Sequence, residues 1–135
     1  MNKGKTQIYR IKVTLRHVAP PVWRRIEVPA DIKLGKLHHV LQVAMGWQGF
    51  HLHQFRLHVV RYGCSALSTR SSGVPLSALG LRKGTRFCYE YDLNLPWAHE
   101  IRVESRIDAQ DGTAYPICTG GSGACPPEDC GGPAR

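Results

Sequence analysis

The sequence has no long apolar run, and this absence narrows the class of protein. None of its apolar stretches approaches the ~20 residues that a transmembrane helix needs. The start, residues 1–7, is basic but leads into alternating residues and not into an apolar block, so it does not resemble a signal peptide. We therefore expect a soluble, cytoplasmic protein with no membrane partner.

Familiar catalytic signatures are also missing. The chain has no HExxH zinc motif, no phosphate-binding glycine loop and no nucleophile elbow, and it shows no internal repeat. Its 135 residues suit one domain spanning 1–135, and a hydrophobic content of 42% excludes wholesale disorder. These observations favour a protein without enzymatic activity.

Acidic residues are scarce in the first two thirds of the chain. Residues 1–91 hold 15 Lys or Arg and only 3 Asp or Glu, whereas residues 92–135 hold 3 basic and 7 acidic residues. A basic segment of this kind attracts a polyanion, the acidic segment or another copy. A simpler explanation of the excess of basic residues is that they solvate the exposed faces of strands, because no base-reading motif accompanies the charge.

Hydrophobic periodicity predicts the elements. Period-two alternation indicates strands at 8–16, 22–28, 51–59, 87–91 and 99–107, and three- and four-residue spacing indicates a helix over 34–45 that Gly46 ends. Residues 64–75 read as a loop and 76–81 as a short helical turn. The fold class is therefore α+β: an antiparallel β-sheet packed by one main helix, in the order ββαβ(α)ββ, with an irregular Gly/Pro/Cys-rich C-terminal segment.

Several strings along the chain form a recognisable combination. They are PPVWRRI (20–26), LH (37–38), MGW (45–47), HLHQF (51–55), Gly84, FCYEYD (87–92), WAHEI (97–101) and ACPPEDCGGP (124–133). Together they resemble the plasmid pRiA4b ORF-3-like family, whose members also occur as TnpR-like passenger proteins of insertion elements. The resemblance implies a small α+β domain associated with mobile elements, with no established biochemical activity.

The chain departs from this family pattern at two places. Residues 93–96 read LNLP where members usually carry a Gly-Asp pair, and the chain stops at Arg135 where members usually continue into an acidic helical tail. The resemblance therefore predicts that the C-terminus of this chain is shortened relative to that of family members.

Three cysteines in the C-terminal segment suggest a structural zinc ion. Cys118, Cys125 and Cys130 lie in a Gly-rich stretch that can fold three thiolates around one ion, and His99 is our choice of fourth ligand. Metal binding would order a segment that cannot otherwise repay its ordering entropy. Free thiols and a Cys125–Cys130 disulfide remain alternatives.

A second choice of metal ligands is the pair His51 and His53. Residues two apart on a strand point the same way, and His38 on the helix is expected to approach the same region. A histidine on an apolar face is more often a hydrogen-bonded core residue. With His99 and Asp92, the pair would build the open site of a small metal-dependent hydrolase, which is one alternative function.

Our main hypothesis is a non-catalytic binding or accessory module with a structural zinc site. It recognises a protein or nucleic acid through basic strands, and it requires Lys12, Arg16, Arg24 and Arg25 to form one surface. A nucleic-acid-binding protein with this basic surface is a further alternative.

Overall fold

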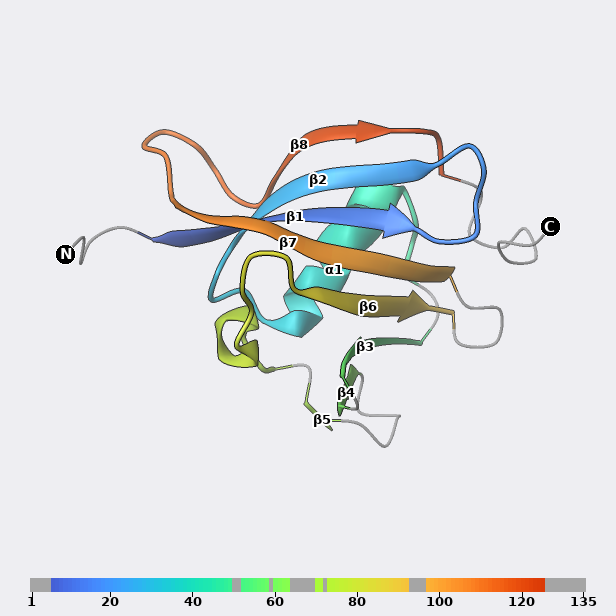
Figure 1. Ribbon diagram of the computed structural model, residues 1–135, viewed down its shortest axis with the longest axis horizontal. Helices are drawn as coiled ribbons and strands as arrows, with labels where there is room; N and C mark the ends of the chain where they lie inside the picture. Colours follow the sequence, from blue (N-terminus) through green and yellow to red (C-terminus); the bar gives the residue numbers. More distant parts are fainter. Residues whose placement is uncertain are drawn as a thin grey trace.

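The structure is a computed structural model, and it describes residues 6–49, 52–58, 60–63, 70–71, 73–92 and 97–125. These residues include eight strands, one α-helix and one 3-10 turn (Figure 1). In chain order the elements are β1 (Gln7–Leu15), β2 (Val22–Pro29), α1 (Leu34–Met45), β3 (His53–Leu57), β4 (Val60–Gly63), β5 (Arg70–Ser71), η1 (Leu76–Leu79), β6 (Arg86–Tyr91), β7 (Trp97–Asp108) and β8 (Ile117–Ser122).

All eight strands belong to one sheet, in the order β5-β4-β3-β6-β7-β1-β2-β8. Neighbouring strands are antiparallel except β4 and β5, which are parallel. The first strand of the chain therefore lies inside the sheet, between β7 and β2, and the last described strand, β8, lies at one edge.

Alternation along the strands separates a buried face from an exposed one. In β1, Ile11 and Val13 are fully buried, while Arg10 and Lys12, which alternate with them, point to the other side of the sheet. The large rings of β6 and β7, which include Tyr89 and Trp97, continue the same buried face. One face of the sheet thus carries the core.

Helix α1 covers this buried face (Figure 1). Its apolar stripe of Leu34, Leu37, Leu41 and Met45 packs inward at helical spacing. Gly46 ends the helix in the left-handed region, at a φ of 74°, and its backbone N–H donates to carbonyls of the last turn. In Figure 1 the opposite face of the sheet looks toward the viewer, and no helix of the described chain covers it.

The predicted fold class, α+β in the order ββαβ(α)ββ, is wrong, because the described chain is mostly β and contains three strands that this order lacks. Those strands are β4, β5 and β8; β5 lies in the predicted loop, and β8 lies in the predicted irregular segment. The Gly-rich sequence ICTGGS shows no alternation. Its strand conformation comes from backbone pairing with β2, which periodicity does not register.

Parts of three predicted elements lie outside the described residues. These are His51 and Val59 at the ends of the predicted third strand, residues 64–69 and 72 of the predicted loop, and residues 126–135 of the predicted irregular C-terminal segment. Within the described ranges, no helix is both long and apolar enough to cross a membrane.

Candidate functional site

A buried polar cluster lies between α1 and the sheet. His38 and Gln42, one helical turn apart on α1, both reach the hydroxyl of Tyr89 on β6, at 2.6 Å from His38 Nδ1 and 2.9 Å from Gln42 Nε2. The His38 ring stacks on the ring of His53 from β3, with centroids 3.6 Å apart and planes 5° apart. The expectation that His38 approaches His53 is confirmed.

Burial keeps this cluster neutral. Desolvation lowers the pKa of His38 to about 3, with a further contribution from the neighbouring His53, and it lowers the pKa of His53 to about 4. Desolvation also raises the pKa of the Tyr89 hydroxyl. Gln42 Oε1 and His53 Nε2 are buried and have no hydrogen-bond partner in the part of the chain that the structure describes.

His99, the predicted fourth zinc ligand, is a core residue. It is fully buried on β7, its Nδ1 lies 3.2 Å from the backbone oxygen of Tyr89, and its ring packs edge-on against Trp47. Burial lowers its pKa to about 4. Its Nε2 is buried without a hydrogen-bond partner among the described residues.

The sheet does not bring His99 and Cys118 together. Two strands, β1 and β2, lie between β7 and β8, so three strand spacings of roughly 4.8 Å separate them. The Cys125 sulfur lies 3.2 Å from Met45 Sδ and 3.7 Å from Arg24 Nη2, and Cys130 lies outside the described residues. Within those residues, no group of three or more His, Cys, Asp or Glu could hold a metal ion. The zinc site stays a prediction.

The predicted hydrolase residues are used in packing where the structure describes them. His53 stacks on His38, and His99 packs against Trp47. Asp92 is buried at the end of β6, and its backbone N–H donates to the carbonyl of Leu52. His51 lies outside the described residues.

The four predicted basic residues do not form one surface. Lys12 and Arg25 are register partners on the open face of the sheet, and their charged groups lie 4.9 and 5.0 Å from the Trp23 ring centroid. Arg16 is exposed just beyond β1. Arg24, next to Arg25 on the same strand, points to the opposite face, as strand alternation requires.

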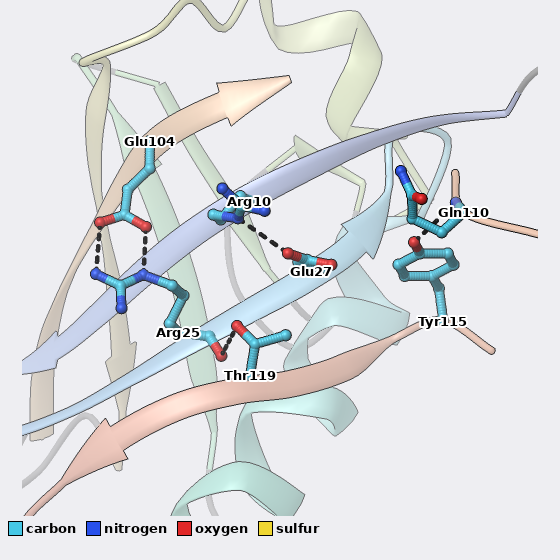
Figure 2. A network of polar contacts seen from close by, with 7 residues as sticks. All are labelled: Arg10, Arg25, Glu27, Glu104, Gln110, Tyr115 and Thr119. Atoms are coloured by element: carbon cyan, nitrogen blue, oxygen red, sulfur yellow. Dashed lines mark hydrogen bonds and ion pairs between the residues drawn. The ribbon is translucent and has the colours of Figure 1, made fainter. Parts of the chain in front are cut away.

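Arg25 is already paired. Figure 2 shows its guanidinium facing Glu104 of β7, with contacts of 2.6 and 3.0 Å. This pairing raises the pKa of Arg25 and holds the pKa of Glu104 below its usual value. A second pair on the same face joins Arg10 and Glu27 at 2.9 Å (Figure 2). Carboxylates thus neutralise part of the basic face.

Arg24 ties the end of α1 to the end of β8. Its guanidinium donates to the carbonyl of Ala44 in α1 at 3.2 Å, and to the carbonyls of Ser122 and Gly123 at 3.1 and 3.0 Å. The side chain therefore has a structural role that its basic character did not reveal.

An apolar groove of about 320 Å³ lies between α1 and β8. We call it the α1–β8 groove, and its lining residues are Ile26, Lys36, His39, Val40, Val43, Ala44, Pro116, Ile117 and Cys118. Val43 is 81% exposed and Ile117 is 38% exposed, although both are large aliphatic residues. Among the described residues no carboxylate lines the groove, and Lys36 carries its fixed positive charge.

Sequence reasoning missed this groove. Its signal is Val43, an apolar residue that falls outside the core-facing stripe of the predicted helix. The other wall could not be anticipated, since β8 was predicted to be irregular.

Comparisons with known proteins agree with the predicted family. The profile of the plasmid pRiA4b ORF-3-like protein family matches residues 7–135. Uncharacterized protein y4hQ of Sinorhizobium fredii (strain NBRC 101917 / NGR234) is 41% identical over 133 residues, which cover 93% of this chain and 68% of that protein. The crystal structure of a protein of unknown function, MM3350 from Methanosarcina mazei Go1, matches with a TM-score of 0.90 and 30% identity, over 95% of this chain and 76% of that one.

Proposed function

Because the chain belongs to the plasmid pRiA4b ORF-3-like family, whose matched relatives carry no stated activity, we propose a function from its own geometry. We propose that it is a non-catalytic protein-binding domain, and that its α1–β8 groove receives an apolar, acidic segment of a partner protein.

The exposure of Val43 is the observation that carries this proposal. An aliphatic side chain that is 81% exposed gains about 1.5–3 kcal/mol on full burial, and here it borders a groove that other apolar side chains line. A volume of about 320 Å³ lies at the small end of the ligand-pocket range. Exposed apolar grooves of this kind are typical of interaction sites.

Charge favours an acidic partner. Lys36 lines the groove, no carboxylate within the described ranges does, and the full sequence carries a net charge of +8. Opposite charge on the partner speeds encounter and suppresses wrong partners. A segment that alternates or mixes aliphatic and acidic residues therefore fits the groove best.

The buried cluster supports a binding role over catalysis. The hydrolase hypothesis uses His53 and His99, yet both are buried against imidazole or aromatic rings and kept neutral, and its third histidine, His51, lies outside the described residues. A general base needs a substrate within hydrogen-bond reach. The cluster instead joins α1 to the sheet.

Selection of peptides tests the proposal. The purified full-length chain is panned against a phage-displayed library of random short peptides, and the enriched peptides are synthesised and titrated by calorimetry. We expect enrichment of aliphatic residues together with Asp or Glu. Val43→Gln, which keeps helix propensity, should weaken binding about tenfold or more, the equivalent of about 1.4 kcal/mol.

A matched pair of charge reversals isolates the groove. Lys36→Glu should weaken binding, whereas Lys83→Glu makes the same change of net charge in an exposed turn away from the groove and should leave it unchanged. Peptides that bind Val43→Gln as well as the parent chain, or a library without enrichment, would contradict the proposal.

A structural zinc ion stays a separate proposal. Cys118 and Cys125 are free thiols, and any ion held by the C-terminal cysteines takes its fourth ligand from a residue other than His99, because the sheet separates His99 from Cys118. Elemental analysis of protein purified without added metal tests it. About one zinc ion per chain, lost in Cys125→Ser, would support the site; metal-free protein with unchanged melting temperature would contradict it.

Nucleic acid is the weaker alternative partner. Of the four basic residues that it requires, Arg24 lies against α1 and Arg25 is paired with Glu104. The nucleic-acid alternative predicts an affinity for duplex nucleic acid that falls steeply as the salt concentration rises, because phosphate contacts release counterions.

A further inference from the structure

We propose that the partner segment binds as an extended strand that pairs with the free edge of β8 and lays alternate side chains into the α1–β8 groove. This inference rests on the proposed function and specifies the conformation of the ligand.

The position of β8 provides the pairing edge. β8 ends the sheet, with β2 on one side and no strand of the described chain on the other. An edge strand presents a row of unpaired N–H and C=O groups, which can pair with a strand from another chain. Five of the six residues in β8 are exposed, so this row is open.

The sequence of β8 leaves its edge weakly protected. Natural edge strands are blocked by charged residues, by proline, by bulges or by being very short. β8 has six residues, none of them charged or proline, and its one irregularity is a bulge between its Gly120 and Cys118 pairs with β2. At the opposite edge, β5 has only two residues, which is itself a form of protection.

The groove lies where an added strand needs it. Pro116, Ile117 and Cys118, at the beginning of β8, form one wall, and Val40 and Val43 of α1 belong to the other. Strand addition combines main-chain hydrogen bonds, which give affinity, with pockets for every second side chain, which give specificity. A peptide along β8 would place one set of alternate side chains between the edge strand and the helix.

Charge argues against a second copy of this chain as the occupant. Two copies that pair through β8 would bring two Lys36 side chains and two chains of +8 net charge together. An acidic peptide would instead be attracted by Lys36 and by the positive net charge of the chain. We therefore assign the edge to a partner segment with aliphatic and acidic residues and not to self-association.

Backbone methylation of the selected peptide tests the strand directly. In a paired strand, alternate N–H groups point toward the neighbouring strand and the others point away. Peptides methylated singly at successive backbone nitrogens should therefore lose affinity at every second position, about tenfold or more, and keep it at the positions between. Amide hydrogen exchange should slow at alternate residues of 117–122 in the complex.

The outcomes separate this inference from the proposed function. A peptide that needs Val43 but tolerates methylation without alternation would overturn strand pairing and leave the groove as a binding site. Absence of any peptide that depends on Val43 would overturn both. Light scattering that shows a dimer without peptide, broken by Val43→Gln, would assign the edge to self-association and overturn the inference.

The chain's own C-terminal residues are the remaining competitor. If Glu128 and Asp129 occupied the groove, the double change Glu128→Lys and Asp129→Lys in the full chain would tighten peptide binding about tenfold. The same double reversal at Asp31 and Asp111, which lie outside the groove lining, raises the net charge equally and is the control. We expect the two double variants to bind alike, and marked tightening in the C-terminal variant alone would overturn the inference.

Discussion

The Tyr89 hydroxyl connects strand β6 to helix α1 through two polar contacts. It accepts a hydrogen bond from Gln42 Nε2 and is 2.6 Å from His38 Nδ1, to which it donates when the proton of His38 is on Nε2. All three side chains are buried away from water, so without these bonds their polar atoms would have no hydrogen-bond partner. One hydroxyl therefore satisfies two polar groups of α1.

Removing this hydroxyl should destabilise the protein. We expect Tyr89→Phe to lower the free energy of unfolding by about 1–3 kcal/mol, because His38 Nδ1 and Gln42 Nε2 would stay buried without a partner. Urea denaturation measures the change. Tyr62→Phe is the control, since Tyr62 is only half-buried, and its hydroxyl makes no hydrogen bond among the described residues. Equal losses in the two variants would contradict this account.

The sequence predicts the contacts and directions of some side chains and not of others. The approach of His38 to His53 followed from helix and strand placement. The opposite directions of Arg24 and Arg25 follow from period-two alternation, so their assignment to one surface contradicted the strand that contained them. The contact of Arg24 with Ser122 could not be predicted, because it depends on β8.

Among the elements, β8 shows the limit of periodicity. Strands β1, β6 and β7 alternate because one face packs on the core, so their sequences report their structure. The residues of β8 are mostly exposed and do not pack into that core. Its pairing with β2 uses backbone groups, which every residue possesses, and the α1–β8 groove was missed with it.

Glycine at the end of β8 allows close approach to β2. Gly123 has a φ of 85°, and a Cβ there would lie 2.6 Å from the carbonyl oxygen of Pro21. Gly112, in the turn before β8, has a similar φ of 80° but open space around it. The two glycines share the left-handed backbone conformation, which only a side chain would strain, and they differ in the space around them.

Alanine at the two glycines should therefore have unequal effects. We expect Gly112→Ala to cost about 1–2 kcal/mol, the usual penalty of a left-handed alanine. Gly123→Ala should cost roughly 1 kcal/mol or more beyond this, because the backbone must also move away from Pro21. Thermal unfolding of both variants measures the difference, and equal midpoints would show that the close approach is unimportant.

Across the whole molecule, three buried histidines link folding to pH. The pKa values of His38, His53 and His99 lie at about 3, 4 and 4 in the folded chain, whereas an unfolded histidine titrates near 6.5. Between these values the unfolded state binds more protons than the folded state. Stability should therefore be full above about pH 6.5 and fall as the pH decreases toward about 4.

One histidine substitution tests this linkage. At about pH 5, each of these histidines should lower stability by about 2 kcal/mol relative to neutral pH. His53→Gln cannot titrate, so its loss between about pH 7.5 and about pH 5 should be smaller than the parent's by about 2 kcal/mol. Urea titrations at the two pH values supply the comparison, and parallel losses in both proteins would refute it.

The central place of β1 affects how the chain folds during synthesis. Gln7 pairs with Asp108, and Leu15 pairs with His99. A ribosome that has released the β1–β2 hairpin must still translate β7 before the hairpin gains its second neighbour. The backbone edge of β1 that pairs with β7 thus stays open through most of translation. Completion of the sheet is therefore a late event in synthesis, and until then this edge is a site at which chaperones can bind.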